Sequence, residues 1–152
     1  MYLESSPTAD DEVNWRAFEE LVAKHVADLD PKARVTHDAR LKGRLSGIDR
    51  QVDVLARGSL AGSMITIAFE CKRYKRSVGI ATVEEFIGKL HDLAVDRGVL
   101  CVFGDVTEPA FWRLAHANHP QIDLYVWRRP KPTGWEIDIN DMGEEVLTPV
   151  YY

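Results

Sequence analysis

The sequence predicts an α/β fold in which a mixed sheet of about five strands is flanked by helices. Amphipathic helical periodicity occurs on both sides of a group of strand-like runs, and a short, fully apolar run follows the second helix. The chain has 152 residues, of which 45% are hydrophobic, enough for one domain with a buried core. We expect this core to span about residues 12–128, with residues 129–152 as a C-terminal extension whose role the sequence does not indicate.

Two long helices are predicted from apolar residues that recur every three or four positions. The first begins near residues 11–14 and ends at about Leu29. The second begins at Thr82, where Glu85, three residues later, completes a capping box. Its exposed face presents Glu84 and Lys89 as side chains that could contact a substrate.

A third, shorter helix is predicted after residue 106. Thr107 supplies the N-cap, and Pro109 fits the first turn of a helix. Phe111, Leu114 and Ala115 are expected to pack inward.

The strand-like runs cover residues 34–44, 51–56, 65–72, 99–103 and 122–127. The first three follow one another through short loops, which favours an antiparallel meander. A helix separates the third run from the fourth, so those two strands should be parallel and joined by a right-handed crossover. Residues 135–139 also alternate, which predicts an extra strand at an edge of the sheet.

Acidic side chains interrupt two of these runs. Asp53 lies between Val52 and Val54, where a carboxylate is costly unless it has a partner. Glu70 and Lys72 share one strand face, so the acid and the amine emerge together at the end of their strand. Asp49 competes with Asp53 for the role of a ligand, but it adjoins a loop and could simply end a turn.

The net charge of −5 conceals a pattern along the chain. Residues 1–30 and 81–152 each carry a net charge of −6, whereas residues 31–80 carry +7. The basic block contains Asp53, Glu70 and Lys72. A basic field around a cluster of acids suits a site for a polyanion, although a solvated basic hairpin would show the same composition.

Asp53 followed by Glu70-x-Lys72 resembles the core motif of the PD-(D/E)XK nuclease superfamily. The flanking residues 50–54 and 69–75 are similar to the Mrr-like restriction endonuclease branch, and the similarity covers about residues 15–117. This resemblance implies a restriction-endonuclease-like core.

The resemblance also implies a set of site residues. Asp53, Glu70 and the backbone carbonyl of Cys71 would bind Mg²⁺ or Mn²⁺, with Glu19 completing the shell directly or through water. Such a metal polarises the scissile phosphate and activates a water molecule. Lys72 would orient that water or neutralise charge that develops on the phosphate.

Glu19 is selected because Phe18-Glu19 matches a Phe-Glu pair on the first helix of the Mrr-like pattern. Glu20 is its alternative, and an exposed position on the helix surface is the ordinary fate of either glutamate.

Cationic and aromatic residues follow the motif directly. Arg73, Lys75 and Arg76 could hold DNA phosphates, and Tyr74 could pack on a sugar or base. Together with the resemblance, these residues predict a metal-dependent DNA nuclease, an endonuclease in preference to an exonuclease. A homodimer is also expected, since two copies related by a two-fold axis would cut both strands of a duplex.

Two other classes of protein fit the same residues. One is a non-cleaving nucleic-acid-binding module of a defence or repair assembly, and the other is an α/β interaction protein whose charges form surface ion pairs. The sequence contains no membrane-length apolar run and no secretory signal, so we expect a cytoplasmic protein. Cys71 and Cys101 should then be reduced thiols.

Overall fold

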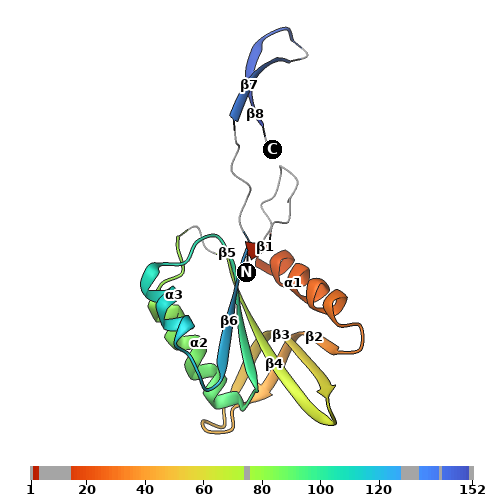
Figure 1. The fold of residues 1–152 in the computed structure, drawn as a ribbon, viewed down its shortest axis with the longest axis vertical. Coiled ribbons are helices and arrows are strands. Elements are labelled where there is room, and N and C mark those ends of the chain that lie inside the picture. Colours follow the sequence, from red (N-terminus) through yellow and green to blue (C-terminus); the bar gives the residue numbers. More distant parts are fainter. Residues whose placement is uncertain (1, 4–14, 74–75, 128–133, 141, 151–152) are drawn as a thin grey trace.

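The computed structural model describes residues 2–3, 15–73, 76–127, 134–140 and 142–150 (Figure 1). In chain order its elements are β1 (Tyr2–Leu3), α1 (Trp15–Leu29), β2 (Arg34–Lys42), β3 (Asp49–Leu60), β4 (Ser63–Arg73), α2 (Ile80–Leu93), β5 (Arg97–Phe103), α3 (Glu108–Ala115), β6 (Gln121–Trp127), β7 (Gly134–Ile139) and β8 (Glu145–Val150).

The main sheet has the strand order β1-β6-β5-β4-β3-β2. Strands β2, β3 and β4 form an antiparallel meander, whereas β4, β5, β6 and β1 run parallel. The predicted mixed sheet is therefore confirmed, with the two-residue β1 added at the edge of β6. The crossover through α2 makes β4 and β5 parallel, as the order of the elements required.

Helix α1 covers one face of this sheet (Figure 1). Phe18, Val22 and Val26 recur at four-residue steps and are buried against a cluster that includes Phe69 and Val99. This packing fixes the face of α1 that points towards β3 and β4.

Helices α2 and α3 cover the opposite face (Figure 1). Val83, Phe86 and Leu90 of α2 belong to a second buried cluster, together with Leu100 and Val102 of β5. Since alternate residues of β5 enter different clusters, this strand is buried on both faces, which explains its uninterrupted apolar sequence.

The predicted capping box at the start of α2 is wrong. The helix begins at Ile80, its N-cap is Gly79, and no side chain caps it. Val78 is tied to the loop before α3, since its amide donates to the Asp105 carbonyl and its own carbonyl accepts from Thr107. These bonds set where the chain enters the helix, two residues before Thr82.

The predicted orientation of α3 is wrong in part. Thr107 caps the helix as expected, and Leu114 is buried, but Phe111 is 52% exposed and Ala115 is also exposed. The buried stripe consists of Ala110 and Leu114, four residues apart. Phe111 and Ala115 lie one position further round the helix, where they line a hollow between α3 and β6 instead of packing in the core.

The predicted edge strand at residues 135–139 is also wrong in its partner. Strand β7 pairs antiparallel with β8 in a separate two-stranded sheet, in a register that places Ile137 opposite Leu147. Figure 1 shows this hairpin apart from the main sheet. Among the described residues, no helix has the length and hydropathy needed to span a membrane.

Candidate active site

The candidate site lies where β3 departs from β4. The paired register of the two strands reaches Val54 opposite Phe69 and goes no further. Beyond this pair the Cys71 N–H donates a hydrogen bond of 2.7 Å to Asp53 Oδ2. The Asp53 carboxylate thus accepts a hydrogen bond from a β4 amide that would otherwise pair with a backbone carbonyl of β3. It therefore lies against the segment that carries Glu70 and Lys72.

Glu70 is buried and has a cation on each of its oxygens. Lys72 Nζ lies 2.9 Å from Oε1, and Lys89 Nζ lies 2.9 Å from Oε2. Alternation along β4 places Glu70 and Lys72 on one strand face, so their contact follows from the strand itself.

Lys89 reaches the site from α2 and is not the exposed side chain that the helix pattern indicated. Its side chain is 18% exposed, and Nζ also donates to the Gln51 carbonyl of β3 at 3.1 Å. The periodicity of α2 shows that Lys89 lies next to the buried Leu90. It does not show that Glu70 of β4 lies opposite Lys89. Glu84, the other predicted contact, forms an ion pair with Arg113 of α3.

Glu19 is buried beneath the same region, whereas its neighbour Glu20 is exposed. A hydrogen bond of 3.0 Å joins Glu19 Oε2 to His37 Nε2 of β2. Sequence reasoning missed His37, although it alternates with Val35 on the less exposed side of β2, which was a usable signal.

The environment of Asp53 raises its pKa from 3.8 to about 6. Burial is the largest cause, followed by the negative charge of Glu70, and Glu19 adds to the effect. The Cys71 N–H and the charge of Lys89 act in the opposite direction. Asp53, Glu70 and Glu19 therefore share one electrostatic environment, whereas Asp49 is exposed and stands outside it.

The donor chemistry of these carboxylates fits a hard divalent cation, because Mg²⁺ prefers oxygen ligands. Within the described residues, however, no three His, Cys, Asp or Glu side chains are arranged so that they could together hold a metal ion. Both oxygens of Glu70 and one of Glu19 have cationic or histidine partners. A metal that binds Glu70 would compete with Lys72 or Lys89 for its oxygens.

The predicted DNA-contacting residues divide into three cases. Arg73 lies with its guanidinium 5.5 Å from the ring centroid of Phe103, and its Nε atom is buried without a hydrogen bond. Arg76 is exposed. Tyr74 and Lys75 lie outside the described residues.

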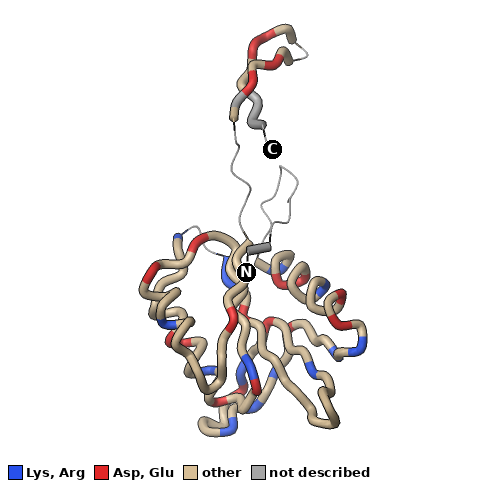
Figure 2. The backbone as a smooth tube through the Cα atoms, viewed as in Figure 1, with Lys and Arg blue, Asp and Glu red and all other residues tan. Residues whose placement is uncertain are grey.

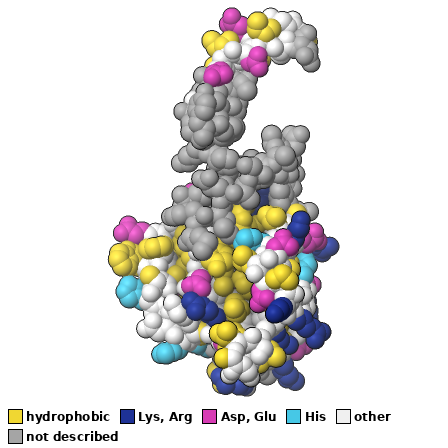
Figure 3. Space-filling model, turned by 45° about the vertical axis from the view of Figure 1, so that its right-hand side comes forward, with side chains coloured by type: hydrophobic (Ala, Val, Ile, Leu, Met, Phe, Trp, Pro, Cys, Tyr) yellow, Lys and Arg dark blue, Asp and Glu magenta, His cyan; other side chains and the backbone are white. Residues whose placement is uncertain are grey.

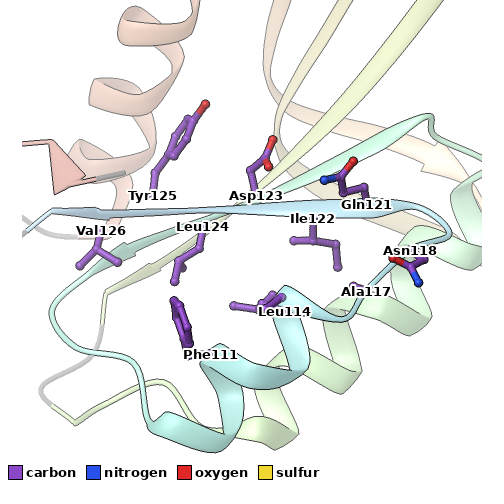
Figure 4. A pocket seen from close by; sticks show the side chains of 11 residues that line it. Phe111, Leu114, Ala117, Asn118, Gln121, Ile122, Asp123, Leu124, Tyr125 and Val126 are labelled. Carbon is purple, nitrogen blue, oxygen red and sulfur yellow. The ribbon is translucent and has the colours of Figure 1, made fainter.

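A cavity of about 680 Å³ lies elsewhere, between β6 and α3. Figure 4 shows Ile122 and Leu124 of β6 facing Leu114 and Phe111 of α3 across it. None of Glu19, Asp53, Glu70 and Lys72 lines this cavity. The acidic cluster, rather than this cavity, is therefore the candidate active site.

Both cysteines are free, as predicted. Cys71 and Cys101 occupy paired positions on β4 and β5. A hydrogen bond with the Cys101 thiol, together with burial, raises the pKa of Cys71 well above its ordinary value. The Cys71 thiol thus stays neutral, and only its backbone takes part in the site.

Several solved structures resemble this one. A protein titled "Crystal Structure of Protein of Unknown Function AF1548" aligns with a TM-score of 0.62 at 14% identity, over 74% of this chain and 58% of that one. The "MspJI Restriction Endonuclease in Complex with 27-mer Oligonucleotide" gives a TM-score of 0.51 at 24% identity, over 76% and 26% of the two chains. The "DNA modification-dependent restriction endonuclease AspBHI" gives 0.47 at 22%, over 71% and 27%.

These similarities concern the fold, and this chain spans only about a quarter of the two restriction endonucleases. No curated protein sequence matches the chain. The sequence profile of the Mrr_cat family, described as "Restriction endonuclease", matches residues 11–129, the region that contains both helical layers and the acidic cluster. The chain therefore belongs to this restriction endonuclease family.

Proposed function

We propose that this protein is a metal-dependent nuclease that hydrolyses phosphodiester bonds of DNA, as an endonuclease. The observation that carries this proposal is the electrostatic strain at Asp53, whose pKa is raised to about 6 by burial and by the charges of Glu70 and Glu19. Excess negative charge in a partly buried place stabilises a bound divalent cation. Membership of the restriction endonuclease family supplies the reaction class.

In this proposal Asp53, Glu70 and the backbone carbonyl of Cys71 hold Mg²⁺ or Mn²⁺, and Glu19 contributes directly or through water. The bound ion would supply Lewis-acid chemistry, polarising the phosphate and lowering the pKa of water. The Cys71 N–H orients Asp53 through its 2.7 Å hydrogen bond. Lys72 orients the attacking water or faces the charge that grows on the phosphate.

The flanking cations are proposed to bind the DNA backbone. Arg76 is exposed and can contact phosphates directly. Arg73 needs only to turn its guanidinium from Phe103 to bring a buried, unbonded Nε to a phosphate oxygen. Tyr74 and Lys75 keep their proposed roles at a base or sugar and at a phosphate.

One observation favours a second candidate, a non-cleaving nucleic-acid-binding module of a defence or repair assembly. Both oxygens of Glu70 are already engaged by ammonium groups, so the carboxylate has no unpartnered oxygen for a metal. Such a module would keep the basic surface and the fold but would not bind divalent cations saturably.

The deciding experiment incubates the purified protein with labelled single- and double-stranded DNA, methylated and branched DNA, and RNA, each with EDTA, Mg²⁺ or Mn²⁺. We expect metal-dependent cleavage of DNA that Asp53→Ala and Glu70→Ala eliminate. Asp49→Ala is the matched control, because Asp49 lies on the same strand but is exposed. Binding of DNA without cleavage under every condition would favour the second candidate.

We also propose that the chain is one domain and acts as a homodimer, since opposite strands of a duplex are most simply cut by two copies related by a two-fold axis. The β7–β8 hairpin supports this proposal. Ile137, Ile139 and Leu147 on the hairpin are each about two-thirds exposed, which suits a surface that contacts a second copy.

A further inference from the structure

Lys89 is a second ammonium group at the candidate site, and it comes from α2 rather than from β4. It lies 2.9 Å from Glu70 Oε2, while Lys72 lies at the same distance from Oε1. The side chains of Glu70, Lys89 and Lys72 are 9%, 18% and 21% exposed. Because water reaches them poorly, these pairs are screened less than pairs on the surface.

Lys89 is also held in place independently of Glu70. Its Nζ donates to the Gln51 carbonyl of β3 at 3.1 Å, and the adjacent Leu90 is fully buried in the core beneath α2. The ammonium group is thus fixed between α2, β3 and β4. A preorganised cation loses little side-chain entropy when it pairs with a carboxylate.

The charges at the site are balanced only in part. The charges of Glu70, Glu19 and Lys89 all act on Asp53. The two ammonium groups, from Lys72 and Lys89, both pair with Glu70, whereas Glu19 is bonded to His37. Without Lys89 one buried oxygen of Glu70 would lose its partner, which is strongly unfavourable.

We propose that Lys89 is a resident counter-ion of Glu70, which stabilises the metal-free site and competes with a divalent cation for Glu70 Oε2. This inference rests on the proposed function, because it assumes that Glu70 is a metal ligand. Lys89 releases Glu70 Oε2 when the cation binds, while the hydrogen bond from Lys89 Nζ to the Gln51 carbonyl remains. The position of Lys89 therefore sets the metal affinity of the site.

Coulomb's law gives the sign and size of the effect. A unit positive charge about 5 Å from a divalent cation lowers the affinity for that cation by at least about tenfold, a value already reached with the dielectric constant of bulk water. Removing the charge of Lys89 should therefore tighten metal binding, whereas a lysine that merely positions Glu70 would weaken binding when removed. The two roles therefore predict opposite changes in metal affinity when the charge of Lys89 is removed.

The test uses Lys89→Met and Lys89→Gln, which remove the charge, and Lys89→Arg, which keeps it. Lys24→Met on the exposed side of α1 is the matched control. Calorimetric titration with Ca²⁺ and Mn²⁺ gives the affinity, and melting in EDTA gives the stability of the metal-free protein. We expect both neutral variants to melt lower in EDTA and to bind metal at least about tenfold more tightly, with Lys89→Arg and Lys24→Met close to the parent protein.

Equal or weaker binding by both neutral variants, with saturable binding by the parent, would overturn the role of Lys89 and leave the proposed function standing. Absence of saturable binding in the parent and in all variants would overturn both. Lys89→Gln keeps a donor for the Gln51 carbonyl, so the comparison survives if Lys89→Met does not fold.

Discussion

The Asp53 carboxylate binds a proton more tightly in the folded protein than in the unfolded chain, since its pKa rises from 3.8 to about 6. A raised carboxyl pKa makes folding more favourable at low pH. The penalty for ionising Asp53 appears as the pH rises through 3.8 to 6 and is complete above that window.

Asp53→Asn should therefore stabilise the metal-free protein at pH 8 and have little effect at pH 4. The amide oxygen can still accept the Cys71 N–H, so the substitution removes charge and little else. After discounting for solvent screening, the difference between the two pH values should be about 1–2 kcal/mol. Urea unfolding in EDTA measures it, with Asp49→Asn as control, and an equal effect at both pH values would contradict the raised pKa.

Lys72→Met should separate binding from chemistry. An ammonium group that faces charge in the transition state contributes more to turnover than to affinity, and such groups are commonly worth about 10²–10⁴-fold. DNA affinity should change far less, because the neighbouring cations remain. Cleavage in Mg²⁺ is compared with DNA binding in Ca²⁺, and cleavage at the parent rate would make Lys72 a mere partner of Glu70.

Four of the residues at the site were predicted from sequence, through strand alternation and the resemblance to the PD-(D/E)XK motif: Asp53, Glu70, Lys72 and Glu19. Alternation could have placed His37 on the inner face of its strand, but its contact with Glu19, like that of Lys89 with Glu70, needed the fold, because each pair joins elements distant in sequence. Sequence periodicity assigns a residue to a face of its own element, but it does not specify what the facing element presents.

At the scale of elements, the turn between β2 and β3 is fastened to α2 by Asp92. This buried carboxylate accepts hydrogen bonds from the amides of Leu45 and Ser46, from the Ser46 hydroxyl and from Arg50 Nε. The Ser46 hydroxyl, then Arg50 and the backbone amides, hold the pKa of Asp92 well below its usual range. Asp92 thus organises a turn that carries the exposed Arg44.

Asp92→Ala should lower the melting temperature clearly at pH 7, because four donors lose their acceptor. A depressed carboxyl pKa gives stability that is present above about pH 4 and is lost as the pH falls below it. The destabilisation should therefore shrink towards pH 2. Thermal melts at both pH values, with the exposed Asp28→Ala as control, test this; the same loss at pH 2 as at pH 7 would exclude a charge-dependent role.

The elements that sequence predicted well are those whose partners are implied by their own pattern. The fully apolar β5 had to be buried on both faces. The apolar stripe of α1 is buried at Phe18, Val22 and Val26, but Trp15 and Leu21, which recur in the same pattern, are exposed, so that part of the prediction was wrong. The start of α2 was missed because a bond between distant loops, from Val78 to Asp105, overrides the local capping signal.

At the scale of the whole molecule, the sign of the charge changes along the chain. The block of net charge +7 at residues 31–80 contains β2, β3, β4 and the acidic cluster, whereas Figure 2 shows acidic segments on the β7–β8 hairpin. A negative net charge therefore does not prevent a locally basic surface from meeting DNA. If DNA binds to the basic surface, added salt should weaken that binding, because salt screens the contacts between cationic side chains and phosphates. The acidic hairpin offers no such contacts.

The β7–β8 hairpin could not be placed from sequence, since alternation at residues 135–139 is equally compatible with an edge strand and with a separate hairpin. Its hydrophobic side chains are visible beside acidic ones in Figure 3. A two-stranded hairpin alone is at best marginally stable in water, so exposed apolar residues on it favour a further contact.

If that contact is a second copy, Ile137→Asp with Leu147→Asp should convert a dimer into a monomer. These two residues face one another across the hairpin and are 68% and 67% exposed, so the charges would meet at the centre of the contact while the main sheet stays intact. Light scattering over a range of concentrations, with and without DNA, measures the mass.

The control is Glu136→Gln with Asp138→Gln, exposed positions that alternate with Ile137 along β7 and so point to the other face. A parent protein that is monomeric under all these conditions would reject the dimer, and an unchanged dimer in the aspartate variant would move the interface away from the hairpin.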